Sequence, residues 1–245
     1  MKKGKKHVLR IWADFGCFSR PELKTERFSY PCPTPSAARG IFDSIYSKAY
    51  DRTTKTAQFY WQVEKIELLT YPSYIALRRN EVSHTVAAER TIGQWMQNPE
   101  SFSPIVADDK NCRQQRQTMA LRNPEFRIHA HIVTRPGFEN SITGYDRQFE
   151  RRATQGKFFA MPCMGCREFP AFFEYIDDAQ NEELPAAFNQ DLGYMLYDVF
   201  DLSTVNNEFA KPYVSVFRAI IENGTLAVPE YFDPKVLKPE VSHAS

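Results

Sequence analysis

Apolar and polar residues alternate with a period of two along several stretches of this chain, which predicts β-strands. The pattern is clearest at residues 126–133, where every second residue is apolar and Arg127, His129 and His131 share the opposite face. Residues 8–15 show the same alternation. Further extended segments are predicted at residues 59–69, 71–77, 169–176, 193–202, 213–222 and 225–228. Asn223-Gly224 is a favourable hairpin turn between the last two of these segments.

Two other stretches follow the 3.6-residue period of an amphipathic helix. The first helix is predicted from Pro35 to about Ala49, because Thr34 can cap its N-terminus and proline suits the first helical position. The second is predicted at residues 141–155 and ends before Gly156, since glycine favours the position after a helix.

The order of the predicted elements is strand, helix, strands, a long polar loop, strand, helix and then strands alone. The loop covers residues 78–118 and contains a short helix near residues 91–97. This order predicts an α+β fold with a ferredoxin-like, RNA-recognition-type domain whose helices cover one face of a sheet. We expect that domain to span residues 1–165, with 78–118 as a loop insertion. Residues 166–245 are expected to form a small C-terminal antiparallel β-sheet annex and tail.

The composition indicates a soluble, cytoplasmic protein. No apolar run approaches the roughly 20 residues of a membrane helix, so we expect no membrane contact. Five cysteines, an odd number, do not suggest a disulfide framework. Cys163 and Cys166 have the spacing of half a zinc site, but the sequence has no second pair, and Gly165 favours a tight turn there. We therefore expect no metal site and no cofactor.

The formal net charge of +1 hides a strong asymmetry along the chain. Residues 110–157 contain ten Lys and Arg against four acids, whereas residues 168–208 contain ten Asp and Glu and no Lys or Arg. Salt screens charges beyond about 8–10 Å, so the two regions act as separate local fields. The basic region can attract a polyanion. The alternative is that both regions are ordinary solvated faces.

Arginines occur in three clusters, at residues 78–80, 111–116 and 151–152. The planar guanidinium binds phosphate through two hydrogen bonds, and Asn or Gln can add base or sugar contacts. These arginines could equally form ion pairs with Glu81, Glu89 or Glu150. Three clusters within about eighty residues favour a surface that binds the phosphates of RNA.

Tyr46 lies at the rim of the first predicted helix, about 80° from the centre of its apolar stripe. A tyrosine there is more often an amphipathic rim residue than a catalytic one. His129 and His131 share a strand face at a spacing that could hold a metal or supply protons, but no nearby carboxylate or third ligand is evident. A pair on the surface of the sheet is the simpler interpretation.

Several longer motifs resemble those of a known family. The strings RIWADFGCFSRPE, SYPCPTPSAARGIFDSIY, LRRNEV, NCRQQR, ERRATQG and PCMGCREFPAFFE look like the Cas-five proteins of type I-C CRISPR systems, from about residue 8 to residue 176. The resemblance implies a metal-independent endoribonuclease that cleaves precursor CRISPR RNA (crRNA) by attack of a 2′-hydroxyl. It also implies that the protein stays on the 5′ handle of the guide in the Cascade complex, next to the backbone and large subunits, and meets target DNA through that complex.

In the family a tyrosine on the first helix matches Tyr46, and some members carry a Lys-His pair before the second helix. Aligning on ERRATQG puts Gly144-Tyr145 at that pair, which is a departure from the pattern. We therefore expect Tyr46, Tyr145 and His131 as catalytic candidates, with Tyr46 in a positioning role because tyrosine is a weak base. RNA contacts are expected from Arg20, Lys24, Arg27, Arg39, Lys48, Arg78, Arg79, Asn80, Arg113, Gln114, Arg116, Arg147, Arg151 and Arg152.

Two alternatives remain open. The protein could be a non-catalytic cap that binds the 5′ handle and organises Cascade, because Gly144-Tyr145 lacks the cation and the proton shuttle of the family pair. A metal enzyme that uses His129 and His131 is a third interpretation, and it requires an activity that EDTA abolishes.

Overall fold

The computed structural model describes residues 1–23, 26–48, 57–82, 89–102, 113–176, 183–203 and 213–239. Its strands are β1 (Lys3–Trp12), β2 (Phe15–Gly16), β3 (Arg27–Phe28), β4 (Phe59–Leu68), β5 (Tyr74–Val82), β6 (Arg113–Arg122), β7 (Glu125–Thr134), β8 (Phe172–Ile176), β9 (Gln190–Asp198), β10 (Ser215–Glu222), β11 (Thr225–Ala227) and β12 (Val236–Leu237). Its helices are α1 (Pro35–Ile45), α2 (Glu89–Gln97) and α3 (Ile142–Thr154), with the 3-10 turns η1 (Pro99–Ser101) and η2 (Glu139–Ser141). Lys24, expected to contact RNA, lies outside the described residues.

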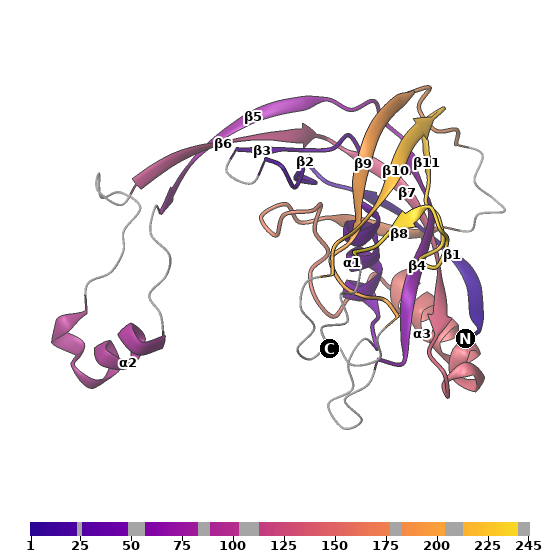
Figure 1. Ribbon diagram of the computed structural model, residues 1–245, viewed down its shortest axis with the longest axis horizontal. Helices are drawn as coiled ribbons and strands as arrows, with labels where there is room; N and C mark the ends of the chain where they lie inside the picture. Colours follow the sequence, from indigo (N-terminus) through magenta and orange to yellow (C-terminus); the bar gives the residue numbers. More distant parts are fainter. Residues whose placement is uncertain are drawn as a thin grey trace.

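The main sheet runs in the order β12-β10-β11-β4-β7-β1-β8, and β9 pairs with β10. All its pairings are antiparallel. Helices α1 and α3 lie together against this sheet (Figure 1). The mixed α and β content is therefore confirmed, with mostly antiparallel sheets.

The core lies between these two helices and the sheet, where three aromatic side chains meet. Trp61 of β4 packs on Phe149 of α3 with ring centroids 4.5 Å apart, and Phe42 of α1 stacks on Phe149 at 5.4 Å. All three side chains are at most 1% exposed. Truncating a buried aromatic side chain costs about 3–5 kcal/mol, so these contacts hold both helices firmly on the sheet.

The predicted long loop at residues 78–118 is wrong at both of its ends, where residues 78–82 and 113–118 belong to strands. Strand β5 continues through Arg78 to Val82, and β6 already begins at Arg113, so the two form an antiparallel hairpin. This hairpin belongs to a second sheet with β2 and β3, and its far part extends away from the main sheet (Figure 1). The apolar alternation is missing because both faces of the far part carry mainly polar side chains. The short helix inside the segment is confirmed as α2.

Local signals for the hairpin turn, the start of α1 and the end of α3 are confirmed. Thr34 accepts a hydrogen bond from the N–H of Ala37 (3.2 Å) and Pro35 opens α1. Asn223 and Gly224 have φ values of 48° and 73°, as a type I′ hairpin turn requires. Gly156, with φ 64°, follows the end of α3.

Helix α1 ends at Ile45, about a turn earlier than the prediction of residue 49. Its last carbonyl groups accept hydrogen bonds from residues elsewhere in the fold. Arg152 Nε donates to the Ile45 oxygen (2.7 Å), and the Phe159 N–H donates to the Ser44 oxygen (2.7 Å). Sequence periodicity contains no information on such tertiary caps.

The boundary predicted between residues 165 and 166 stays a prediction. Strands from both sides of it share the main sheet, since β8 pairs with β1 and β11 pairs with β4. In the described part of the chain, no helix combines the length and the apolar character that crossing a membrane takes.

Candidate functional site

Tyr46 occupies the C-terminal cap of α1 and has extended backbone angles (φ −153°, ψ 120°). The helical backbone predicted for Tyr46 is therefore wrong, because α1 has already ended. Its N–H still donates to the Phe42 oxygen (3.0 Å), and its own carbonyl accepts from Trp61 Nε1 (3.0 Å). These bonds fix the backbone of Tyr46 against the core and leave the side chain half-buried at its edge.

The side chain of Tyr46 lines a hollow of about 510 Å³ between the end of α1 and the start of α3. Its lining residues are Tyr46, Lys48, Asn140, Ser141, Gly144, Tyr145 and Gln148. The tertiary structure thus brings together both predicted catalytic tyrosines and the predicted RNA contact Lys48. Arg151 lies beside the hollow and donates to Gln148 (3.1 Å). Arg147 is exposed on the same helix.

The two tyrosines of the hollow differ in what their hydroxyl groups do. The Tyr145 hydroxyl donates to Gln58 Oε1 (2.8 Å), and the residue is 8% exposed. Tyr46 is less enclosed, but burial, reinforced by the nearby Tyr145, raises the pKa of its phenol above the ordinary value of 10.0. Tyr46 therefore keeps its proton at neutral pH and can donate a hydrogen bond, which suits positioning and does not suit base catalysis.

Gly144 leaves the hollow open, because a Cβ built on it meets no atom within 4 Å. Replacing this helical glycine with alanine is expected to raise the free energy of unfolding by about 0.5–1 kcal/mol, since alanine loses less backbone entropy in a helix. Gly40, on α1, has equally open surroundings and is the matched control for stability. Urea denaturation of both variants checks this; a loss of stability in Gly144→Ala alone would contradict it.

His131 does not lie at this hollow. It pairs with Gln62 in register, which puts it on the face of the sheet opposite Trp61 and the helices. Its Nδ1 contacts Glu64 Oε1 (2.6 Å). His129 shares that face, and its Nε2 contacts a different carboxylate, Glu67 (2.7 Å). The expectation that no carboxylate lies near the pair is wrong, because β4 supplies one to each histidine.

Glu67 is itself part of a buried charge cluster. It accepts a hydrogen bond from Arg127 as well as from His129. Burial opposes ionisation of Glu67, yet these hydrogen bonds prevail and hold its pKa well below the ordinary value. The cluster therefore keeps a charged carboxylate inside the fold. Arg127 and His129 come from β7, and Lys65 of β4 also donates to Glu67 Oε1 (2.7 Å).

A further buried histidine, His7 of β1, has a structural role that the sequence pattern did not indicate. Its Nε2 contacts Asp146 Oδ1 of α3 (3.0 Å), and its ring packs edge-on against Phe149 at 4.8 Å. Asp146 directly follows Tyr145, so this pair helps to set the position of the helix that lines the hollow. Only the pairing of distant segments could reveal it, since 139 residues separate the two side chains.

The arginines of the β5–β6 hairpin divide between two faces. Arg78, Asn80 and Arg113 are exposed and share one face with Tyr74, as the register and the alternation of the two strands require. We call this set the outer face. Among the described residues, no ion pair holds Arg78 or Arg113. Phe28 of β3 extends the outer face, since its ring lies 5.4 Å from that of Tyr74.

The opposite, inner face of the hairpin carries paired arginines. Arg79 and Arg27 both donate to Glu168 Oε1, at 2.7 and 2.8 Å. Arg116 lies 3.4 Å from Glu81 Oε2, and its guanidinium also donates to Gln114 (3.3 Å). The alternative of an ion pair with Glu81 is thus confirmed for this face, whereas Glu150 pairs with Lys5 instead of an arginine.

The other predicted RNA contacts are scattered. Arg20 stacks over the ring of Tyr30 at 4.7 Å and reaches Phe28 at 5.8 Å, so it borders the outer face. Arg152 caps α1, as described above. Arg39 is directed inward: its guanidinium donates to both carboxylate oxygens of Asp198 (2.8 and 3.0 Å). Sequence reasoning missed this ion pair, because its partners are 159 residues apart.

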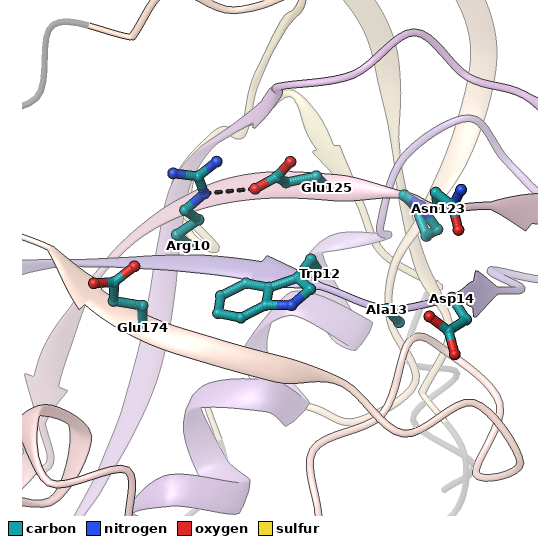
Figure 2. Close-up of a pocket in the computed structure, with 8 residues that line it drawn as sticks. Arg10, Trp12, Ala13, Asp14, Asn123, Glu125 and Glu174 are labelled. Carbon is teal, nitrogen blue, oxygen red and sulfur yellow. Dashed lines mark hydrogen bonds and ion pairs between the residues drawn. The ribbon is translucent and has the colours of Figure 1, made fainter.

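A second hollow, of about 440 Å³, lies on the main sheet where β1, β7 and β8 meet (Figure 2). The ring of Trp12 stacks on Phe172 with an interplanar angle of 24°, and both side chains are exposed. Arg10 bonds to Glu125 (2.5 Å), while Glu174 and Asp14 line the hollow at its rim. The hollow is therefore aromatic and net acidic.

Comparisons with known proteins agree with this arrangement. A family model described as CRISPR-associated protein (Cas_Cas5) matches residues 8–229. A CRISPR pre-crRNA endoribonuclease Cas5d of Mannheimia succiniciproducens is 37% identical over 236 residues, which cover 93% of this chain and 96% of the relative. The protein of the same name from Thermus thermophilus is 34% identical over 249 residues, with 96% of each chain covered.

A solved structure, the crystal structure of a CRISPR-associated protein, shares the fold with a TM-score of 0.63 and 16% identity, and 94% of each chain is covered. The family match spans most of the chain, and both relatives match it nearly end to end. This chain therefore belongs to the CRISPR-associated Cas5 family, in the type I-C branch that its motifs resemble.

Proposed function

We propose that this protein is a metal-independent endoribonuclease that cleaves CRISPR repeat RNA and then holds the 5′ handle of the crRNA within a type I-C Cascade. Its two relatives carry the name pre-crRNA endoribonuclease. The observation that carries the proposal is the hollow at the end of α1, where a protonated tyrosine and the cation Lys48 lie together at an exposed edge. The RNA, the backbone and large subunits of Cascade and the target DNA are the proposed partners.

The domain that carries this hollow is proposed to be ferredoxin-like. Strands β8, β1, β7 and β4 are neighbours in that order, and α1 and α3 follow β1 and β7 in the chain. A β-α-β-β-α-β unit with helices on one face has this arrangement. The C-terminal strands β9 to β12 extend its sheet beyond β4, in line with a small β-rich annex.

The proposed reaction needs no group beyond the chain and the RNA. The 2′-hydroxyl oxygen attacks the adjacent phosphorus and loses its proton, the bond to the 5′ oxygen breaks, and that oxygen takes up a proton. The products are a 2′,3′-cyclic phosphate and a 5′-hydroxyl end. The Tyr46 O–H would hold a phosphate or 2′ oxygen in line, and Lys48 would offset the additional phosphate charge.

The test compares two tyrosines of one hollow that undergo the same chemical change. In EDTA, wild-type protein is expected to cleave its cognate repeat RNA, and Tyr46→Phe is expected to lower the single-turnover rate about 100-fold by removing one hydrogen-bond donor. Tyr145→Phe removes a hydroxyl already bonded to Gln58, so its loss of rate should stay below about tenfold. His131→Ala should leave the rate unchanged, because the residue lies on the other face of the sheet.

The outcomes separate the candidate functions. No product from wild-type protein would overturn the nuclease, and equal rates for Tyr46→Phe and wild type would remove that tyrosine from the chemistry. Because the pKa of Tyr46 is raised, its deprotonation should produce no change in the wild-type rate below about pH 10. A fall in rate centred near pH 8 and absent from Tyr46→Phe would contradict the assigned role.

A non-catalytic handle-binding cap is the second candidate, and Gly144 is the observation that favours it. The space beside Gly144 holds no side chain, whereas some members of the family carry a lysine at the position aligned with it. Under this alternative, wild-type protein would bind the 5′ handle tightly while leaving the repeat RNA intact. A gel-shift assay on the same samples used for cleavage decides between the two.

RNA is proposed to lie along the outer face of the hairpin. Arg78 and Arg113 offer guanidinium groups there that form no ion pair within the described part of the chain, and the rings of Tyr74 and Phe28 can stack on unpaired bases. The acidic, aromatic hollow around Trp12 would repel phosphates and is proposed to face a protein subunit of Cascade instead (Figure 2).

A further inference from the structure

Two cysteines that are far apart in the sequence meet beside the turn at Cys163–Cys166. The N–H of Cys17 donates to the Met164 oxygen (2.9 Å), which holds this turn against the end of β2. Gly165 has φ +81°, and a Cβ built on it would lie 2.1 Å from the Cys17 oxygen. Only glycine allows this approach, so the turn is fixed with Cys166 next to Cys17.

The Cys166 thiol is surrounded by polar partners. In its protonated form the thiol donates to the Cys17 carbonyl oxygen (3.4 Å), and Arg27 Nη1 donates to Cys166 Sγ at 3.6 Å. The Ser19 hydroxyl lies between the two thiols, 3.4 Å from Cys17 Sγ and 4.0 Å from Cys166 Sγ. A guanidinium and a hydroxyl at these positions stabilise a thiolate, and Cys166 is only partly buried, so reagents can reach it.

We propose that Cys166 is a modification site for hydroperoxides, with Cys17 as the resolving thiol that converts the first product to a disulfide. In the first step the Cys166 thiolate sulfur attacks one peroxide oxygen and the O–O bond breaks. The leaving oxygen takes a proton, and Cys166 becomes a sulfenic acid. The Cys17 sulfur then attacks the Cys166 sulfur, the S–O bond breaks, and water leaves with the Cys17 proton. Two thiols lose two electrons in total, and one peroxide is reduced.

The acidities of the four described cysteines single out Cys166 as the attacking thiol. Hydrogen bonding with Cys166, together with burial, raises the pKa of Cys17, so Cys17 stays protonated until it resolves the sulfenic acid. Hydrogen bonding with Cys17 holds the pKa of Cys166 below the ordinary thiol value, and the charge of Arg27 and the Ser19 hydroxyl add to this effect. Burial and the negative charge of Glu168, which pairs with Arg27, oppose it. Burial raises the pKa of Cys163 and of Cys32, which is fully buried. The thiolate, which is the reactive form, therefore concentrates at Cys166 at neutral pH.

The experiment uses the reduced full-length protein and resolves each cysteine by peptide mass spectrometry. Iodoacetamide at pH 7 is expected to alkylate Cys166 at least about tenfold faster than Cys163 or Cys32. Arg27→Gln should slow Cys166 about threefold or more, while Arg167→Gln, a neighbouring arginine without a bond to this sulfur, should not. Equal rates at Cys163 and Cys166 in wild-type protein would overturn the proposal.

Hydrogen peroxide then tests the resolving step. One equivalent should produce a peptide pair linked through Cys17 and Cys166 and should leave Cys32 reduced. In Cys17→Ser the sulfenic acid should persist on Cys166, where dimedone traps it, and Cys166→Ser should form no linked pair with Cys17. A linkage between Cys163 and Cys166, or no oxidation at Cys166, would count against the assignment.

Discussion

Replacing Arg39 with alanine is expected to lower the free energy of unfolding by about 3–5 kcal/mol, because it leaves a buried carboxylate without its partner. Asp198 has only 2% of its side chain exposed and accepts two hydrogen bonds from the Arg39 guanidinium. Asp43, one helical turn away, makes a further bond to Arg39 (3.2 Å). The guanidinium therefore joins α1 to β9, and its loss should also loosen the helix that ends at Tyr46.

Urea denaturation measures this effect, and the same region offers a matched control. Arg218 of β10 pairs with Asp191 of β9 at 2.5 Å, but both side chains are about half exposed. Exposed ion pairs contribute about 0–1 kcal/mol, so Arg218→Ala should change stability little. Similar losses for the two variants would show that burial does not govern the Arg39 pair. A loss of RNA affinity in Arg39→Ala without any loss of stability would favour a direct RNA contact.

Replacing Arg78 and Arg113 together with glutamine is expected to weaken binding of the crRNA handle about tenfold at 0.15 M salt. Both guanidinium groups are exposed on the outer face. Arg113 pairs with Val82, four residues from Arg78 along β5, so the two arginines are roughly 13 Å apart along the strands. Two lost phosphate contacts should lower the slope of log affinity against log salt by about 1.4, because each contact to a single strand releases about 0.7 counterion.

The inner face supplies the control for this prediction. Arg79 and Arg116 neighbour Arg78 and Arg113 in the same strands, but their charges are engaged by Glu168 and Glu81. Replacing both with glutamine should leave the salt slope within about 0.5 of the wild-type value. Fluorescence anisotropy over a salt series measures all three proteins. A larger change in slope for the inner-face pair would reverse the proposed orientation of the RNA.

Local structure in this protein could be predicted well wherever neighbouring residues determine it. Thr34 and Pro35 start α1 as expected, because capping and a proline at the first position depend only on adjacent backbone groups. The turn at Asn223-Gly224 follows from the ability of both residues to adopt positive φ. Gly165 permits the tight turn between Cys163 and Cys166 for the same reason.

Longer-range features escaped prediction. The far part of the β5–β6 hairpin was predicted as a loop because mainly polar side chains occupy both of its faces, so no apolar alternation marks the strands there. The predicted end of α1 was wrong because its last carbonyl group accepts a hydrogen bond from Arg152, which is more than one hundred residues away in the chain. Tyr46 was identified through the resemblance, but its extended backbone and its place in the hollow depend on that tertiary cap.

The sequence by itself determined the family, the starts and turns of the main elements, and which residue types could bind RNA, since these depend on motifs and on neighbouring residues. The tertiary structure alone decided which charges remain available. Arg78 and Arg79 are adjacent in the chain, yet a strand directs them to opposite faces, and only Arg79 meets Glu168. Arg39 meets Asp198, and His131 meets Glu64, through strand pairings and packing between distant segments. Ion pairing requires side chains within about 4 Å, and the folded chain alone brings such distant residues that close.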